Sequence, residues 1–332
     1  MDPLKPIRTF LSSSSRLRPL AYRLVSWPAL NSAGLYRAIY HRRIAAQQKD
    51  LSHFPRVVSI EGTTLCNARC LMCGHKDMRR AQGSMAWPLY QNIIDQIAGK
   101  PLELLLLSGY GEPLLDDFLA RRIACAKKAG IGNIGIVTNA SLLTPDRAGE
   151  LIAAGIDLLH ISLDGASAKT YSRLRPGLDF EAVTANIEHL LARRVRPKVH
   201  IQVVLLDQDA GEQTAIACRW GKRADRLVFR QAQNWAGRVK LPEAASSPHL
   251  RKRSGAPPCL YLWDQLNIYW DGTVPACCLD YEACQTVGNV ANETLADVWN
   301  GKPLAALRDK HNAGHRGEIP LCRHCDYFSV WW

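Results

Sequence analysis

Short apolar runs alternate with amphipathic stretches along most of the chain after residue 55. Runs rich in Val, Ile and Leu are typical of buried strands, and they cover 56–61, 102–108, 133–138, 158–163, 199–205 and 227–230. Apolar residues at helical spacing predict helices between them, at 87–98, 115–129, 144–154, 179–194 and 211–223. Such alternation implies right-handed crossovers and a parallel sheet. We therefore predict an α/β fold whose core, residues 51–245, is an open, partial (β/α)6 barrel with reactive residues at the carboxyl ends of its strands.

The first 50 residues differ from this core in both pattern and charge. Leu17, Leu20 and Leu24 repeat at helical spacing with arginines between them, and 34–48 has the pattern of a second helix. Residues 1–49 contain nine Lys or Arg and one acidic residue. We predict a basic helical N-terminal arm, 1–50, either packed as a helix pair or docked on an anionic membrane surface or acidic partner. Its Ser- and Arg-rich composition also resembles an organelle transit peptide.

Composition narrows the class of protein. The chain is 47% hydrophobic and 22% charged, which is typical of a globular protein. Its longest apolar run, 104–107, is far shorter than the ~20 residues that span a bilayer, and no secretory signal pattern precedes it. We therefore expect a cytoplasmic protein in which the eleven cysteines do not form a disulfide framework and the grouped ones bind metal. The net charge of +12 is concentrated in the arm, so we expect no nucleic acid partner.

Three cysteines after the first predicted strand form the strongest chemical signal. Cys66, Cys70 and Cys73 have the spacing CxxxCxxC, and a single loop can place three thiolates around one iron–sulfur cube. A cluster of four irons has four ligand positions. Because the loop provides only three cysteines, one iron would be open to a small molecule. The alternative is a zinc site that His75 completes.

This loop resembles that of the radical S-adenosylmethionine (SAM) superfamily, and the resemblance extends over 55–235 and 259–325. It implies a [4Fe–4S] cluster on these cysteines that reductively cleaves S-adenosyl-L-methionine to a 5′-deoxyadenosyl radical, which abstracts hydrogen from a substrate. The segment after the second strand, Ser108–Pro113, is similar to the Gly-Gly-Glu-Pro motif of the family, although Tyr110 replaces the first glycine. The resemblance implies that Gly111, Glu112 and Pro113 hold the methionine amino group.

Further positions at strand ends match the family pattern. Asn139, Ser162 and Asp164 occupy places where the resemblance implies contacts with the ribose or the carboxylate of the cofactor. Met72 lies where the family usually has an apolar or aromatic residue against the adenine. Each of the polar residues is, taken alone, equally typical of a turn or a helix cap. His160 and Gln202 also lie near strand ends, but the pattern assigns them no function.

A second cysteine set follows a Pro-, Ala- and Ser-rich linker, in residues 246–332. It resembles the start of the SPASM auxiliary-cluster domain in its shortened "twitch" form. The resemblance implies one auxiliary [4Fe–4S] cluster with four ligands, Cys259, Cys277, Cys322 and Cys325. The neighbouring Cys278 is the alternative to Cys277, and Cys284 is a spare candidate.

Three further predictions concern this half of the chain. A four-cysteine zinc knuckle is the rival interpretation of the tail. Asp280 lies where related enzymes have a general base near the substrate, which makes it the candidate catalytic residue. Cys125 and Cys218 lie in helical patterns and are predicted to be core residues.

The predicted function is that of a radical SAM oxidoreductase with two [4Fe–4S] clusters. A single-cluster tail favours net oxidation or remodelling of a small molecule, a sugar or an alcohol, over the alternative of a peptide substrate. An electron donor such as flavodoxin or ferredoxin would reduce the clusters. The alternative function, from a different class of protein, is that of a metal-stabilised nucleic-acid-binding protein with two zinc sites and a basic arm.

Overall fold

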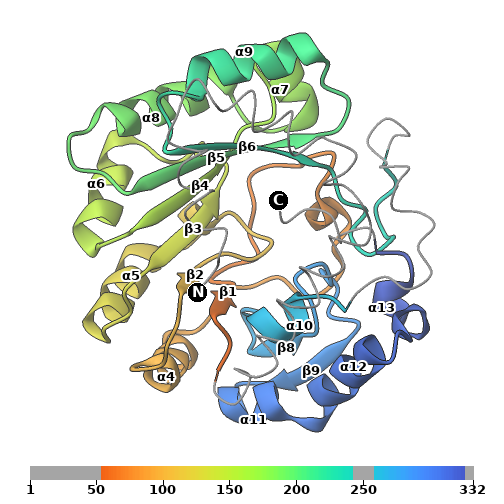
Figure 1. Ribbon diagram of the computed structural model, residues 1–332. Helices are drawn as coiled ribbons and strands as arrows, with labels where there is room; N and C mark the ends of the chain where they lie inside the picture. Colours follow the sequence, from red (N-terminus) through yellow and green to blue (C-terminus); the bar gives the residue numbers. More distant parts are fainter. Residues whose placement is uncertain (1–53, 242–257, 326–332) are drawn as a thin grey trace, which may run out of the picture. The chain divides into compact units, whose positions relative to one another are not determined.

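A seven-stranded parallel sheet forms the centre of the molecule (Figure 1). The computed structural model describes residues 54–241 and 258–325, which belong to one compact unit. The strand order is β6-β5-β4-β3-β2-β1-β7. The predictions for the basic arm and most of the linker lie outside the described residues.

All six predicted strands are present, and their ends differ from the prediction by two residues at most. They are β1 (Val57–Ile60), β2 (Leu104–Leu106), β3 (Ile134–Thr138), β4 (Leu158–Ser162), β5 (Lys198–Leu205) and β6 (Arg226–Gln231). Each pairs in parallel with the next. The apolar runs predicted them because strands of a parallel sheet are covered by crossover helices.

The predicted crossover helices are also present. They are α4 (Trp87–Ile97), α5 (Leu119–Lys128), α6 (Pro145–Ala154), α8 (Phe180–Ala192) and α9 (Ala210–Trp220). Local signals fix several ends: Thr144 caps α6, Asp179 caps α8, and Gly155 ends α6 in a left-handed conformation. Helix α5 begins later than predicted because a 3₁₀ turn, η2 (Pro113–Leu115), comes before it. The short helix α7 (Ala168–Leu174) was not predicted.

The partial barrel has a seventh strand, which corrects the predicted count of six. Strand β7 (Gln265–Ile268) comes from the segment after the linker and pairs in parallel with β1, with Val57 opposite Gln265. The prediction missed it because four residues with no adjacent partner strand give no local signal. The first and last parts of the described chain therefore share one sheet.

The rest of the tail packs beside β7. It consists of α10 (Tyr261–Asp264), β8 (Thr273–Pro275), β9 (Thr286–Asn289), α11 (Leu295–Asn300), α12 (Lys302–Asn312), η4 (Arg316–Glu318) and α13 (Pro320–Arg323). Strands β8 and β9 form an antiparallel pair. Among the described residues, no helix is long and apolar enough to cross a membrane.

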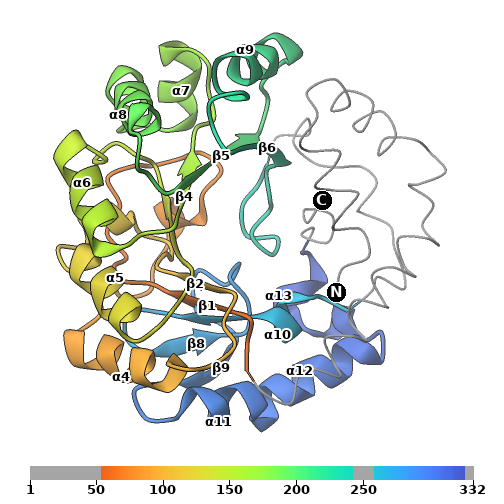
Figure 2. The same ribbon diagram turned by 60° about the vertical axis from the view of Figure 1, so that its left-hand side comes forward.

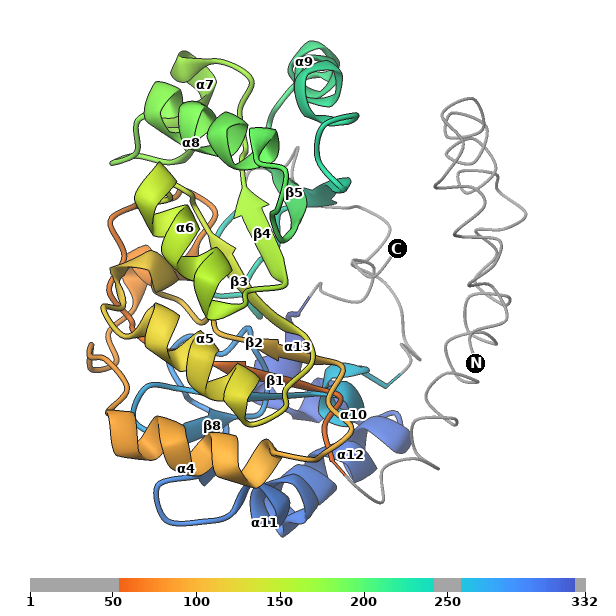
Figure 3. The ribbon, with the colours of Figure 1, turned by 90° about the vertical axis from the view of Figure 1, so that its left-hand side faces the viewer.

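The two faces of the sheet have different environments. Helices α4 to α9 lie along its outer face (Figures 2 and 3), where Leu159, Ile161, Ile201 and Val203 are almost completely buried. The alternate residues of β4 and β5 point to the inner face, where His160, Ser162, His200 and Gln202 are partly exposed. The prediction that Cys218 is a core residue is wrong: it is exposed on α9.

Candidate functional site

The loop after β1 places three cysteines at the carboxyl edge of the sheet, each of them half-buried. Cys73 caps the 3₁₀ helix η1 (Gly74–Asp77), and the backbone N–H of His75 donates to its Sγ at 3.4 Å. Arg175 donates to Cys70 Sγ at 3.6 Å. Hydrogen-bond donors directed at sulfur suit thiolates, the form in which cysteine binds metal.

The protonation of these cysteines also depends on a metal. Burial raises the pKa of Cys66 and Cys70, and it raises the pKa of Cys73 to about 12. Three partly buried thiolates are therefore favourable only beside a cation, and three cysteines in one loop fit an iron–sulfur cluster with one open iron.

In the zinc alternative at this loop, His75 would be the fourth ligand. The Nε2 atom of His75, the proposed fourth ligand, contacts the backbone oxygen of Thr64 at 2.7 Å. A zinc ion would need this nitrogen as a ligand at ~2.0–2.1 Å, so the zinc alternative requires the contact between His75 and Thr64 to open.

Glu112 joins the ends of β2 and β3 beside the cysteine loop. Its Oε2 accepts from the backbone N–H of Asn139 at 2.8 Å, and its Oε1 accepts from the Thr138 hydroxyl at 2.5 Å. Burial raises the pKa of this carboxyl. Its neighbour Gly111 packs so closely that a Cβ there would lie 2.3 Å from the carbonyl oxygen of Thr63, and Pro113 starts η2.

Asn139 also reaches the cysteine loop. Its Nδ2 donates to Asn67 Oδ1 at 3.0 Å, and its Oδ1 accepts from the N–H of Ser141 at 2.9 Å. Gly111, Glu112 and Asn139 thus lie around the loop of Cys66, although they come from separate segments. Their contacts with a cofactor stay predictions.

The other predicted cofactor residues differ in their burial and in their hydrogen-bond partners. Asp164 is fully buried: Arg175 Nε donates to its Oδ2 at 2.7 Å, and the N–H of Val204 donates to its Oδ1 at 2.7 Å. A direct contact from this carboxylate to the ribose stays a prediction, and the structure shows it positioning Arg175 instead. Ser162 is partly exposed at the end of β4. Met72 is buried, and its carbonyl accepts from the indole N–H of Trp235 at 2.6 Å.

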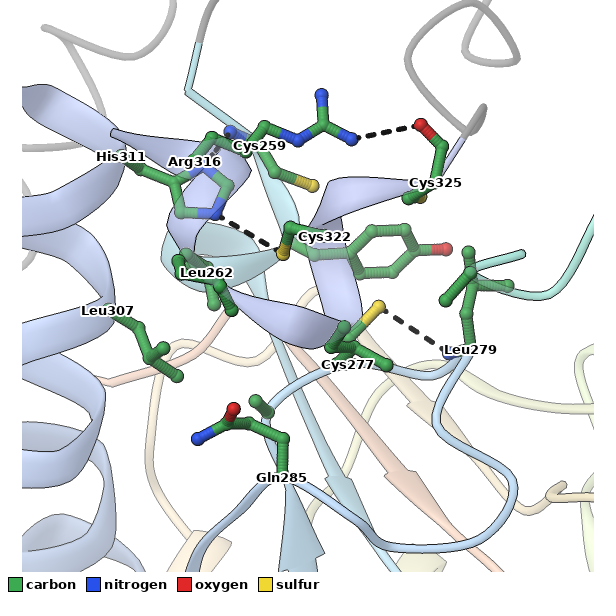
Figure 4. A pocket seen from close by; sticks show the side chains of 15 residues that line it. Cys259, Leu262, Cys277, Leu279, Gln285, Leu307, His311, Arg316, Cys322 and Cys325 are labelled. Carbon is green, nitrogen blue, oxygen red and sulfur yellow. Dashed lines mark hydrogen bonds between the residues drawn. The ribbon is translucent and has the colours of Figure 1, made fainter. Parts of the chain in front are cut away.

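The four predicted ligands of the second site line one cavity (Figure 4). Cys259, Cys277, Cys322 and Cys325 come from three separate segments and meet around this cavity. Cys278 is not among the lining residues. Burial and the neighbouring thiols raise the pKa of Cys259 and Cys322, that of Cys322 to about 12, so this set also fits a cationic metal group.

His311 is a further residue of this cavity, and the sequence analysis missed it. Its Nδ1 accepts from the backbone N–H of Cys259 at 3.1 Å, which places the proton of the neutral ring on Nε2. That Nε2 lies 3.5 Å from Cys322 Sγ (Figure 4). One histidine on α12 therefore contacts two of the four predicted ligands. A single histidine in a polar helix gives no sequence signal for such a role.

Asp280, the candidate base, lies in the loop between β8 and β9 and is completely buried. Its Oδ1 accepts from Arg238 Nη1 at 2.7 Å, and its Oδ2 accepts from the N–H of Gln285 at 2.7 Å. A base needs a carboxylate oxygen that is free to accept a proton. In this arrangement both oxygens of Asp280 already accept hydrogen bonds. Its catalytic role stays a prediction.

The loop after β6 contacts both cysteine sites. The sequence analysis did not predict this link. Trp235, Ala236 and Gly237 are successive residues with φ values of 49°, 59° and 85°. Trp235 donates to Met72 in the first cysteine loop, while Ala236 lines the second cavity. Left-handed backbone at two residues with a Cβ costs roughly 1–2 kcal/mol each, so the packing on both sides holds this loop in place.

Comparisons with known proteins agree with this geometry. Residues 60–216 match the family model of the radical SAM superfamily, and 259–326 match the SPASM model of an iron–sulfur cluster-binding domain. A structure of SuiB from Streptococcus suis bound to its precursor peptide SuiA has a TM-score of 0.65 at 16% identity, covering 87% of this chain and 74% of that one.

Curated relatives match over different lengths. The AdoMet-dependent heme synthase of Methanosarcina barkeri is 36% identical over 42% of this chain and 40% of its own length. The S-adenosyl-L-methionine-dependent 2-deoxy-scyllo-inosamine dehydrogenase of Niallia circulans is 23% identical over 82% of this chain and 94% of its own. The first six curated relatives match over only 30% to 48% of their lengths. The two matched models imply [4Fe–4S] clusters and S-adenosylmethionine, and the chain belongs to the radical SAM superfamily with a SPASM-type cluster-binding domain.

Proposed function

We propose that this chain is a radical SAM oxidoreductase with two [4Fe–4S] clusters, which oxidises an alcohol-bearing small molecule such as a sugar. The observation that carries this proposal is the pair of separate cysteine sites, one with three ligands in a single loop and one with four around a cavity. When bound, a cluster with one open iron supplies the electron that cleaves S-adenosylmethionine and so generates the hydrogen-abstracting radical.

The residues around the first site would position the cofactor. Glu112 fixes the ends of β2 and β3, and the backbone around Gly111 is close to the cysteine loop, so acceptors for the methionine ammonium group converge there. Arg175, held by Asp164, directs positive charge to Cys70. Ser162 and Asn139 complete the set of polar side chains at neighbouring strand ends.

Two considerations favour a small molecule as the substrate. The dehydrogenase of Niallia circulans is matched over nearly its whole length, whereas the peptide-bound SuiB exceeds the matched region by about a quarter. In addition, the tail has cysteines for one auxiliary cluster. A peptide substrate is the second candidate, supported by the similarity in fold to SuiB. A flavodoxin or ferredoxin is the proposed electron donor.

Asp280 is the proposed base, and it would accept a proton only after a contact with Arg238 or Gln285 opens. Asp280→Asn tests this role. Loss of substrate oxidation with iron content and SAM cleavage intact supports the base, whereas unchanged oxidation removes it.

The experiment for the proposed function is anaerobic reconstitution, with iron and sulfide counted per chain and 5′-deoxyadenosine measured under a strong reductant. We expect roughly eight irons and 5′-deoxyadenosine formation, and Cys66→Ala should abolish the latter. Cys218→Ala, at an exposed position of α9, is the matched control and should behave as the wild type. Bound zinc without SAM cleavage would contradict the proposal and favour the nucleic-acid-binding alternative.

The arm, residues 1–50, is proposed to contact an anionic membrane surface because of its basic amphipathic pattern. Liposome flotation with and without residues 1–49 tests this, and equal recovery of both proteins would remove the idea.

A further inference from the structure

The inner face of β4, β5 and β6 carries basic, neutral polar and apolar side chains and no acidic ones. Strand register places ten residues on this face: Leu158, His160, Ser162, Lys198, His200, Gln202, Val204, Arg226, Val228 and Arg230. On β4 and β5, their neighbours in sequence, among them Leu159, Ile161, Ile201 and Val203, are the residues buried beneath the outer helices. Three arginines or lysines without a carboxylate among ten positions give this face a positive potential.

Arg230 is the residue of this face that most clearly lacks a partner. It lies at the carboxyl end of β6, one residue before the strand ends. Its Nε is buried without a hydrogen-bond partner, and the guanidinium forms no ion pair, among the residues that the structure describes. A buried guanidinium N–H without an acceptor is costly, so an acceptor from outside the described chain is the simplest way to satisfy it.

Polar donors lie beside Arg230 on the neighbouring strands. Gln202 Nε2 donates to His160 Nδ1 at 2.8 Å, which leaves the proton of the neutral imidazole on Nε2. The ring of His160 lies 5.1 Å from that of His200, centroid to centroid. Burial, and after it the charges of His200, Arg230 and Arg226, lower the pKa of His160 to about 4. His160 is therefore a neutral N–H donor in a positive field at neutral pH.

We propose that this inner face is an anion site that binds a carboxylate or phosphate group of the substrate, with Arg230 as its principal contact. This inference rests on the proposed function, since it assigns an acidic sugar or a phosphorylated alcohol as the substrate class of the same active site. Strand β4 carries His160 two residues before Ser162, a predicted cofactor residue, so an anion held here lies next to the place of hydrogen abstraction. Arg230 provides a planar donor group, which suits both anions.

The test uses the reconstituted full chain, titrated by calorimetry with inorganic phosphate and separately with malonate. We expect saturable binding of at least one probe, and the tighter one identifies the anion class. Arg230→Gln should weaken it about tenfold or more, as loss of a charged hydrogen bond does, while Arg230→Lys should retain part of the affinity. Arg223→Gln is the matched control, because Arg223 lies on the outer side of the sheet near Glu188, and it should not change the affinity.

Several outcomes would overturn the site. One is the absence of saturable binding, and another is wild-type affinity in Arg230→Gln. The third is a loss of affinity in Arg223→Gln as large as in Arg230→Gln, which would mean that the excess basic charge of the chain binds the probes. Each titration is repeated with saturating S-adenosylmethionine. Displacement of the probe would show that Arg230 serves the carboxylate of the cofactor instead of a substrate. Anion binding does not need SAM cleavage, so failure of this site and failure of the proposed function are measured separately.

Discussion

The guanidinium of Arg238 donates to Asp280 at 2.7 Å, and this contact joins the loop after β6 to the loop between β8 and β9. The aspartate side chain is completely buried, whereas that of Arg238 retains 26% exposure. The pair therefore holds the Trp235–Gly237 segment against the tail. A residue predicted as a base has a structural contact that the sequence did not indicate.

Replacing Arg238 should lower the free energy of unfolding more than neutralising Asp280 does. Arg238→Gln leaves a buried carboxylate without its counter-ion, and we expect a loss of about 1–3 kcal/mol, less than for a fully buried pair because Arg238 is partly exposed. Asp280→Asn removes the buried charge itself and should cost less. Thermal unfolding midpoints of the reconstituted variants measure both, and the double variant should be more stable than Arg238→Gln. Equal midpoints for Arg238→Gln and wild type would show that the pair adds nothing.

The two adjacent cysteines of the tail provide a matched test of the auxiliary site. Cys277 lines the cavity with the other three predicted ligands, and Cys278 does not. We therefore expect Cys277→Ala to lose roughly four irons per chain, whereas Cys278→Ala keeps the wild-type count. Iron and sulfide analysis after anaerobic reconstitution distinguishes the two. The reverse pattern would transfer the ligand role to Cys278.

Much of the fold could be predicted from the sequence because its strands are buried on both sides. Six apolar runs between amphipathic helices indicated the sheet, and its reactive edge followed from the parallel direction of the strands. The spacing of Cys66, Cys70 and Cys73 predicts the first cluster site for the same reason: all the information is local. Strand β7 was missed because its partner, β1, is about 200 residues away in sequence.

The parts of the site that the sequence did not reveal depend on contacts between distant segments. Asp164 and Asp280 were selected for their positions after strands or turns, but Arg175 and Arg238 engage them from other elements. His311 becomes part of the second site only when α12 packs beside Cys259. Residue type and spacing predict which groups are present, and packing determines which of them stay free to react.

Gly111 should be essential for the geometry of the first cluster. A Cβ at this position would lie 2.3 Å from the carbonyl oxygen of Thr63 and 2.7 Å from that of Leu65, so Gly111→Ala must displace the backbone just before Cys66. We expect loss of the first cluster, roughly four irons, and of SAM cleavage. Gly132→Ala is the control, because nothing lies within 4 Å of a Cβ there and its φ is not in the left-handed region. Wild-type iron content in Gly111→Ala would contradict the close packing.

His160 should make the stability of the protein depend on pH in the acidic range. Burial lowers its pKa from 6.5 to about 4 in the folded protein, so the unfolded chain binds a proton between these values while the folded one does not. The contribution of His160 to the free energy of unfolding therefore has its full value above pH 6.5. It falls as the pH drops towards 4, by up to about 3 kcal/mol. His160→Gln should flatten the dependence. Unfolding midpoints of both proteins between pH 5.5 and 7.5 measure the difference, and parallel curves would show that His160 does not titrate in this way.

The hydrogen bond from His311 should tune the auxiliary cluster. With Nδ1 accepting from Cys259, the Nε2–H of His311 faces Cys322 Sγ at 3.5 Å, and a donor to a ligating sulfur stabilises the more negative, reduced state. We expect His311→Phe to shift the midpoint potential of this cluster to more negative values and to weaken iron retention by about tenfold. His311→Gln, which keeps a donor, should recover part of the shift, and Lys310→Ala, exposed on the same helix, should cause none. Redox titration followed by electron paramagnetic resonance measures the potential, and an unchanged value in His311→Phe would mean that the histidine only fills the cavity wall.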